Sequence, residues 1–292
     1  MIVRLALFAF ALFALPPLAL LVAGSEQPGE TLYPGDDAAA MLTAIAATAV
    51  LGWLLDRLTY RRKKHSLLHS ERRYAQWLAT CGAILGPLLS WMNLYAPAWL
   101  TETAGFVQTL VLNSLLGAVL LPTVLILRNW LGGLPGLVKF GSRRFALPAV
   151  QPQSAIPLLL LAGLAGLLGG PVRPDALFWL YWAAPLTLLV ALQLMWHENT
   201  VFADLKSGNW HRIVLGTLSG LLAGAVTLTA YHLAGGSLIA LLPRWSIPFG
   251  LMLYGLLCLQ IGDIVAESRR GKKRGEVFKK KSFPIPVVVK KD

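Results

Sequence analysis

The sequence predicts an all-α protein: a polytopic, integral membrane bundle of about eight transmembrane helices, with both termini in the cytoplasm. Of the 292 residues, 56% are hydrophobic and only 14% are charged. Mean hydropathy is +0.62. A soluble domain carries about 25% charged residues, so this chain has too little charge to cover a water-facing surface. The composition therefore excludes a soluble enzyme and a nucleic-acid-binding domain.

Apolar runs define the expected helices, because a helix needs about 20 mostly apolar residues to cross the hydrocarbon core of a bilayer. The run at 155–170 is the shortest, and the apolar piece at 237–242 is expected to form an interfacial turn. Residues 1–268 would then form the membrane domain and 269–292 a basic cytoplasmic tail. The eight expected spans lie near 3–23, 38–55, 76–97, 104–127, 155–170, 176–196, 213–234 and 247–266.

The distribution of basic residues sets the orientation, because Lys and Arg concentrate in cytoplasmic loops. The chain has 26 Lys and Arg against 14 Asp and Glu. With the N-terminus inside, every basic residue except Arg173 and Arg244 falls in an inside segment. This asymmetry predicts a multi-pass protein of a cytoplasmic (inner) membrane. The first run, ending at Ala23-Gly24-Ser25, is interpreted as a retained helix, with a cleaved signal peptide as the alternative.

Small residues at every fourth position predict where helices pack. In lipid no hydrophobic force drives helices together, so close backbone approach and dispersion contacts hold them. The expected packing residues within the chain are Gly82, Gly86, Gly216, Gly220 and Gly224. The alternative is a dimer interface.

Uncharged polar residues are the best candidates for a substrate site, because no Asp, Glu, Lys or Arg falls near the middle of a span. Asn93, Gln108 and Asn113 are expected in the outer and middle parts of two neighbouring spans. An outward-facing cavity lined by these amides would suit a neutral or zwitterionic solute or a lipid headgroup. With the proline-containing helices, it favours a carrier or flippase-like protein. Hydrogen bonds between helices are the simpler use of these amides.

A second hypothesis places chemistry in the 197–212 loop. His197 with Glu198 or Asp204 could perform acid–base catalysis, and His197 with His211 could ligate haem. Enzyme activity is nevertheless not favoured, because no nucleotide-binding, metalloprotease or serine-hydrolase motif occurs. No other cofactor is expected. His65 and His69 have helical i, i+4 spacing, but the surrounding basic residues repel a metal cation.

Basic clusters predict contacts with anionic lipid headgroups, which attract Lys and Arg close to the membrane surface. Beyond them, the apolar segment at 283–289 is a candidate ligand for a soluble protein partner. That segment supports another interpretation, a non-catalytic anchor or scaffold subunit of a larger complex. Nucleic acid is not an expected partner. The residues expected at anionic lipid are Arg61, Arg62, Lys63, Lys64, Arg269, Arg270, Lys272, Lys273 and Arg274.

Overall fold

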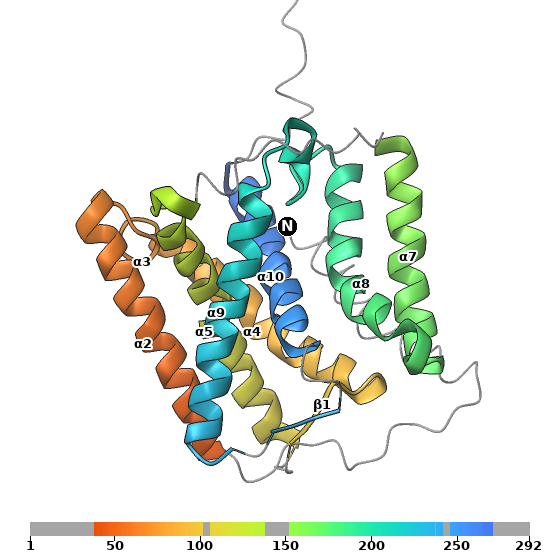
Figure 1. Cartoon of the computed structure of the whole chain (residues 1–292), viewed down its shortest axis with the longest axis horizontal. Coiled ribbons are helices and arrows are strands. Elements are labelled where there is room, and N and C mark those ends of the chain that lie inside the picture. Colours follow the sequence, from red (N-terminus) through yellow and green to blue (C-terminus); the bar gives the residue numbers. More distant parts are fainter. Residues whose placement is uncertain (1–37, 102–105, 138–151, 237, 242–245, 271–292) are drawn as a thin grey trace, which may run out of the picture.

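The computed structural model describes residues 38–101, 106–137, 152–236, 238–241 and 246–270, and this part of the chain contains seven membrane-spanning helices (Figure 1). Each is long and apolar enough to cross a bilayer. The all-α bundle expected from the sequence is therefore confirmed, while the first expected span, at 3–23, lies outside the described residues. The helices are α2 (Ala38–Lys63), α4 (Arg72–Tyr95), α5 (Phe106–Leu131), α7 (Pro152–Val172), α8 (Pro174–Met195), α9 (His211–Leu233) and α10 (Ser246–Arg270).

The helices extend beyond the apolar runs that identify them. α2 continues to Lys63, eight residues past the expected end at 55, because its polar last turns remain helical at the membrane surface. α7 has 21 residues instead of the short span at 155–170, because the polar first turn at Gln153 and Ser154 is also helical. A hydropathy window finds the hydrocarbon-embedded part of a helix and omits such ends.

A short antiparallel ladder joins two loops at one end of the bundle. Strand β1 (Trp99–Thr101) follows α4, and strand β2 (Leu238–Ala240) follows α9, with Trp99 opposite Ala240. The segment expected as an interfacial turn at 237–242 thus contains a strand. Pairing gives the extended backbone of both loops hydrogen-bond partners, which it would otherwise need from water.

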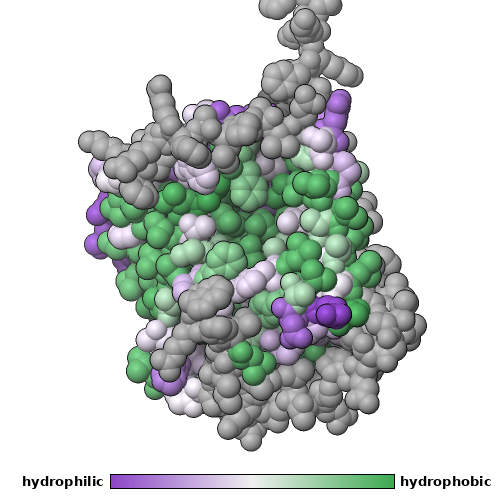
Figure 2. Space-filling view, turned by 45° about the vertical axis from the view of Figure 1, so that its right-hand side comes forward, coloured by the Kyte–Doolittle hydropathy of each residue, from purple (hydrophilic) through white to green (hydrophobic). Residues whose placement is uncertain are grey.

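The helices pack mainly as antiparallel hairpins. The pairs are α4 with α5, α7 with α8, and α9 with α10, and α2 lies against α5 and α9. α7 packs mainly on α8, and α8 joins the rest of the bundle through α10 and through hydrogen bonds of Tyr181 and Trp182 to the end of α4 and the residue after it. Figure 2 shows a surface that is hydrophobic across its middle and more hydrophilic towards both ends, as expected for a protein surrounded by lipid.

The two ends of the bundle differ in charge. We call the end that carries the last turns of α2, α5, α8 and α10 and the first turns of α4 and α9 the basic end; it is uppermost in Figure 1. Arg61, Arg62, Lys63 and Lys64 are exposed there. The opposite end, with β1 and β2, is the ladder end. By the positive-inside rule, the basic end is expected to face the cytoplasm.

Glycines bring the helices together at mid-membrane depth. A Cβ placed on Gly82 of α4 would overlap the carbonyl oxygen of Gly117 of α5, and one on Gly86 would overlap that of Asn113. On α9, a Cβ at Gly220 would overlap the backbone of Gly255 of α10, while Gly216 and Gly224 lie against leucine side chains of α10. The five glycines expected at packing positions therefore all lie at contacts between helices of this chain.

Candidate functional site

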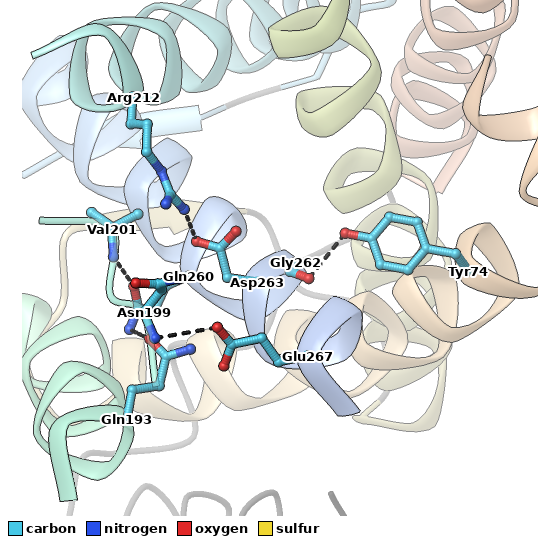
Figure 3. Close-up of polar contacts among 9 residues, drawn as sticks. All are labelled: Tyr74, Gln193, Asn199, Val201, Arg212, Gln260, Gly262, Asp263 and Glu267. Atoms are coloured by element: carbon cyan, nitrogen blue, oxygen red, sulfur yellow. Dashed lines mark hydrogen bonds and ion pairs between the residues drawn. The ribbon is translucent and has the colours of Figure 1, made fainter. Parts of the chain in front are cut away.

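Polar side chains gather on one face of α10 near the basic end (Figure 3). Gln260, Asp263 and Glu267 occupy positions i, i+3 and i+7, which share a face of a helix. That face meets the first turn of α9, the last turns of α8 and the loop between α8 and α9. Each of the three side chains has a hydrogen-bond or ion-pair partner there.

The loop between α8 and α9 is fixed by two of these side chains. The Gln260 Oε1 atom accepts a hydrogen bond from the Val201 N–H at 2.9 Å, and its Nε2 atom donates to Gln193 on α8. Glu267 Oε1 accepts from the Asn199 N–H at 3.2 Å. The polar face of α10 thus supplies partners for a loop backbone that would otherwise be buried without them.

An ion pair links α9 to the same face. Arg212 Nη2 donates to Asp263 Oδ2, and the two side chains are 19% and 21% exposed. Beside this pair, Tyr74 of α4 donates its hydroxyl to the Gly262 carbonyl oxygen at 2.9 Å. These contacts tie the ends of α4, α9 and α10 together (Figure 3).

A buried carboxylate organises the turn after α2. Asp56 accepts hydrogen bonds from Ser66 Oγ at 2.8 Å and from the Leu68 N–H at 3.1 Å. These bonds fold the segment containing α3 (Leu67–Ser70) back against α2. The turn also contains Lys64, whose backbone is left-handed with a φ of 56°.

A cavity of about 340 Å³ opens beside this turn, between the basic ends of α2, α4, α5 and α9 and the turn that contains α3. Three leucines give it an apolar side, while two cations, a carboxylate, two histidines, an amide and a phenol give it a polar side. Its lining residues are Lys63, His65, Leu67, Glu71, Tyr74, Leu125, Arg128, Asn129, Gly132, His211 and Leu215.

Arg128 is the most unusual of the lining residues. Its guanidinium, on the last turn of α5, is half-buried and makes no hydrogen bond or ion pair within the described part of the chain. Asp263 is close enough to attract it, but Asp263 is already paired with Arg212, which repels Arg128. Among the described residues, Arg128 therefore faces the cavity without a hydrogen-bonded or ion-paired partner.

Two other polar groups of the cavity complement Arg128. His211 is the first residue of α9, and its Nε2 atom is buried without a hydrogen-bond partner among the described residues. Lys63, at the exposed end of α2, donates to the backbone oxygen and Oδ1 of Asn129, both at 3.3 Å. The first turn of a helix also carries partial positive charge, so the wall at His211 favours an anion.

Only one of the four residues suggested for catalysis or haem ligation lines this cavity. His211 does; His197 is exposed, with a left-handed φ of 54°, and Glu198 is buried beside Glu267. Asp204 lies in the short 3₁₀ helix η2 (Ala203–Ser207). Among the described residues, no group of three or more His, Cys, Asp and Glu side chains could hold a metal ion.

The three amides expected in an outward-facing cavity are not brought together at the cavity described above. Asn93 Oδ1 accepts from the Ala98 N–H at 2.8 Å, and Asn93 Nδ2 donates to the Trp99 carbonyl oxygen at 2.9 Å, so this amide holds the loop before β1. Gln108 is exposed. Asn113 is half-buried, and its backbone carbonyl oxygen lies against Gly86.

The residues expected at anionic lipid lie partly within the described structure. Arg61, Arg62, Lys63 and Lys64 project at the basic end of α2. Arg269 and Arg270 form the last turn of α10, and Lys272, Lys273 and Arg274 lie outside the described residues. The sequence does not identify Arg128 as a site residue, because a single arginine at the end of an apolar run indicates only the orientation of the helix in the membrane.

Together, the seven apolar helices and the charged ends define a multi-pass membrane protein. Comparison with protein-family models, with curated proteins and with solved structures finds no match to this chain.

Proposed function

We propose that the protein is a flippase-like carrier that takes an amphiphilic substrate from the leaflet at its basic end. The observation that carries this proposal is the cavity at the basic end of the helices, which is lined by leucines and by charged and polar groups. By the positive-inside rule, that leaflet is the cytoplasmic one.

The size of the cavity supports an amphiphile that is only partly enclosed. Sites for small molecules typically measure about 300–1,000 Å³. A volume of about 340 Å³ accommodates a headgroup and the first carbons of its chains. The remaining hydrocarbon would stay in the bilayer, where transfer to the protein offers it no hydrophobic gain.

The prolines of α4 and α5 support a carrier that changes shape. Pro87 and Pro122 each remove a backbone hydrogen bond near the middle of a helix, which favours bending there. The glycine contacts between the same helices close the bundle at mid-membrane depth. A substrate moving from the cavity to the other leaflet would require these contacts to open, so the described structure corresponds to a state closed at this level.

The test is a flipping assay with purified protein reconstituted into vesicles that carry a headgroup-labelled fluorescent phospholipid in both leaflets. Dithionite destroys the label in the outer leaflet, so flipping increases the destroyed fraction from about half to nearly all. We expect this increase with the wild-type protein and a slower one with Arg128→Gln. Vesicles containing Arg73→Gln, which removes an exposed charge at the same end, should match the wild type.

Bleaching that stops at the level of protein-free vesicles, for every labelled phospholipid tried, would contradict a lipid carrier. Correctly folded protein must be shown in the same vesicles, for example by protease accessibility of its loops.

A second candidate is a membrane anchor subunit, and the observation that favours it is the exposed face of α7. Leu158 and Leu161 are 67% and 68% exposed, and α7 packs mainly on α8, which leaves room for a neighbouring helix. Purification in a mild detergent followed by mass measurement distinguishes the two candidates. A stoichiometric partner would favour the anchor, and an isolated chain that still flips lipid would favour the carrier.

A further inference from the structure

We propose that the cavity binds a singly charged phosphate diester of its ligand between Arg128, His211 and Lys63. This inference rests on the proposed function in treating the cavity as the substrate site, and it goes further by naming the chemistry that the site recognises. Binding can be measured without transport, so the two proposals can fail separately.

The half-buried positive charge of Arg128 favours an anion as ligand. A guanidinium withdrawn from water is costly to bury unless it is paired and hydrogen-bonded. Asp263 attracts Arg128 but forms its ion pair with Arg212, and no ion pair of Arg128 is found among the described residues. A phosphate ester placed in the cavity would offer the planar guanidinium two acceptor oxygens, which is the geometry arginine binds best.

His211 provides a second group for the same anion from a different helix. Its Nε2 atom is buried without a partner among the described residues and, with an N–H at that position, could donate to a phosphate oxygen. The first turn of α9, which begins at this residue, adds the favourable dipole of a helix N-terminus.

The charge of the lining favours one negative charge over two. Lys63 and Arg128 are cations, whereas Glu71 is the only carboxylate in the lining, and Glu71 lies 3.7 Å from His65. With neutral histidines, the lining carries a net charge of about +1, which a phosphate diester balances. A monoester carries close to two negative charges at neutral pH and would meet repulsion from Glu71.

The apolar side of the cavity identifies what the phosphate is attached to. Leu67, Leu125 and Leu215 line the same space as Arg128 and His211. A free phosphate would leave these leucines in contact with water, whereas the glycerol and first chain carbons of a phospholipid would cover them. The expected ligand is therefore the phosphodiester headgroup of a lipid.

Calorimetric titration of the full-length protein, purified in a maltoside detergent without phosphate, tests the site. The probes are dihexanoyl phosphatidylglycerol, dihexanoylglycerol, which lacks the phosphate, and inorganic phosphate. We expect the phospholipid to bind at least about tenfold more tightly than dihexanoylglycerol, in line with charge-assisted hydrogen bonds. Equal affinity for these two lipids would overturn the proposal.

Variants then assign the binding to the cavity. Arg128→Gln should weaken phosphatidylglycerol binding about tenfold, and the matched control Arg73→Gln, at an exposed position in the first turn of α4, should change it less than about twofold. Equal losses in both variants would mean general attraction to a basic surface and would overturn the site. If Arg128→Gln does not fold, His211→Gln on a separate helix should still weaken binding several-fold, and unchanged binding there would also overturn it.

The third probe, inorganic phosphate, shows whether the bound phosphate belongs to a lipid or to a soluble compound. Inorganic phosphate binding as tightly as the phospholipid would support the phosphate site and assign it to a soluble ester. Phospholipid binding without flipping would support the site and refute the carrier. Flipping with binding unaffected by Arg128→Gln and His211→Gln would keep the carrier and refute the site.

Discussion

Near the middle of the spans, α4 meets α5 and α9 meets α10 backbone to backbone at glycines, whereas at the basic end polar side chains tie α4 and α9 to α10 beside a cavity. Gly82 contacts Gly117 and Gly220 contacts Gly255 in the middle. At the end, Arg212 pairs with Asp263 and Tyr74 donates to Gly262. The difference shows how one bundle uses two kinds of contact at two depths.

The surroundings of the helices, hydrocarbon in the middle and partly hydrated headgroups at the end, explain why the two depths use different contacts. In hydrocarbon, tight packing is the main attraction available between helices, and it requires residues without side chains. Near the headgroups, charged side chains can be partly hydrated and therefore cost less to place. The polar end can accordingly carry an unbalanced charge such as that of Arg128, whereas the middle cannot.

The largest expected effect comes from adding one methyl group in the middle. Gly117→Ala would place a Cβ against the backbone of Gly82 and Gly86, which cannot move without separating α4 from α5. We expect a loss of about 3 kcal/mol in unfolding free energy, at the upper end of overpacking costs. The measurement is the apparent unfolding midpoint in detergent.

Gly250→Ala on α10 is the matched control, because a Cβ there meets nothing within 4 Å. Alanine is the better helix former, so this change should be neutral or stabilise by up to about 1 kcal/mol. Similar losses at Gly117 and Gly250 would show that the glycine contact does not control the stability of the middle.

The second effect concerns the ion pair of the basic end. Asp263→Asn leaves Arg212 without its partner and removes the acidic neighbour of Arg128, so we expect a loss of about 2 kcal/mol. Adding Arg212→Gln to this variant should recover part of the loss. A double-mutant cycle on apparent unfolding free energies measures the coupling, which should be about 1–2 kcal/mol.

The exposed pair His65–Glu71 supplies the contrast at the same end. Its side chains are 64% and 47% exposed, and His65 Nε2 lies 3.7 Å from Glu71 Oε1. Glu71→Gln should change stability by less than about 0.5 kcal/mol. A larger effect than that of Asp263→Asn would reverse our assignment of which charges hold the end together.

A third effect tests whether the amides outside the basic end are structural. Asn93→Ala would remove the partners of the Ala98 N–H and the Trp99 carbonyl, so we expect a loss of about 1–2 kcal/mol. Gln108→Ala, at an exposed position, should change stability by less than about 0.5 kcal/mol. Loss of flipping in Gln108→Ala with stability unchanged would restore the outward-facing cavity as a substrate site.

The smallest effect should come from the polar contact within the middle. Thr48 Oγ1 of α2 lies 2.7 Å from Thr227 Oγ1 of α9. Both hydroxyls also contact carbonyl oxygens of their own helices, four residues earlier, so each retains a partner when the other is removed. Thr48→Val should therefore cost only about 0.6 kcal/mol, the average found for hydrogen bonds between membrane helices. A cost above that of Asp263→Asn would show that polar contacts also dominate the middle.

Much of this fold follows from local properties of the sequence. Runs of apolar residues identify the helices because a bilayer requires all backbone groups to be satisfied within the segment. Glycine spacing locates the contacts of Gly82, Gly86, Gly216, Gly220 and Gly224, because only small residues allow close approach. Gly117 and Gly255, on the facing helices, were not recognised, because each stands alone without a repeated spacing.

The candidate site depends on contacts between distant segments, which the sequence does not show. Leu67, Arg128 and His211 come together only after α3, α5 and α9 have packed. Lys63 was expected to contact lipid headgroups and His211 to take part in catalysis, but nothing in the sequence indicates that they share a cavity. Likewise, no local pattern shows that Asp263 pairs with Arg212 and leaves Arg128 unbalanced.

The ladder of β1 and β2 has a mechanical consequence for the whole bundle. It joins the loop after α4 to the loop after α9, and at the same end Tyr181 and Trp182 of α8 donate to the carbonyl oxygens of Met92 and Ala96. Hairpins tied at one end can separate only by rotating about that end. For a helix of 23 residues, about 35 Å long, a rotation of about 5° displaces the free end by about 3 Å. If the protein opens, the ladder end is therefore expected to serve as the hinge, and the basic end would separate only after the Arg212–Asp263 and Tyr74–Gly262 contacts are released.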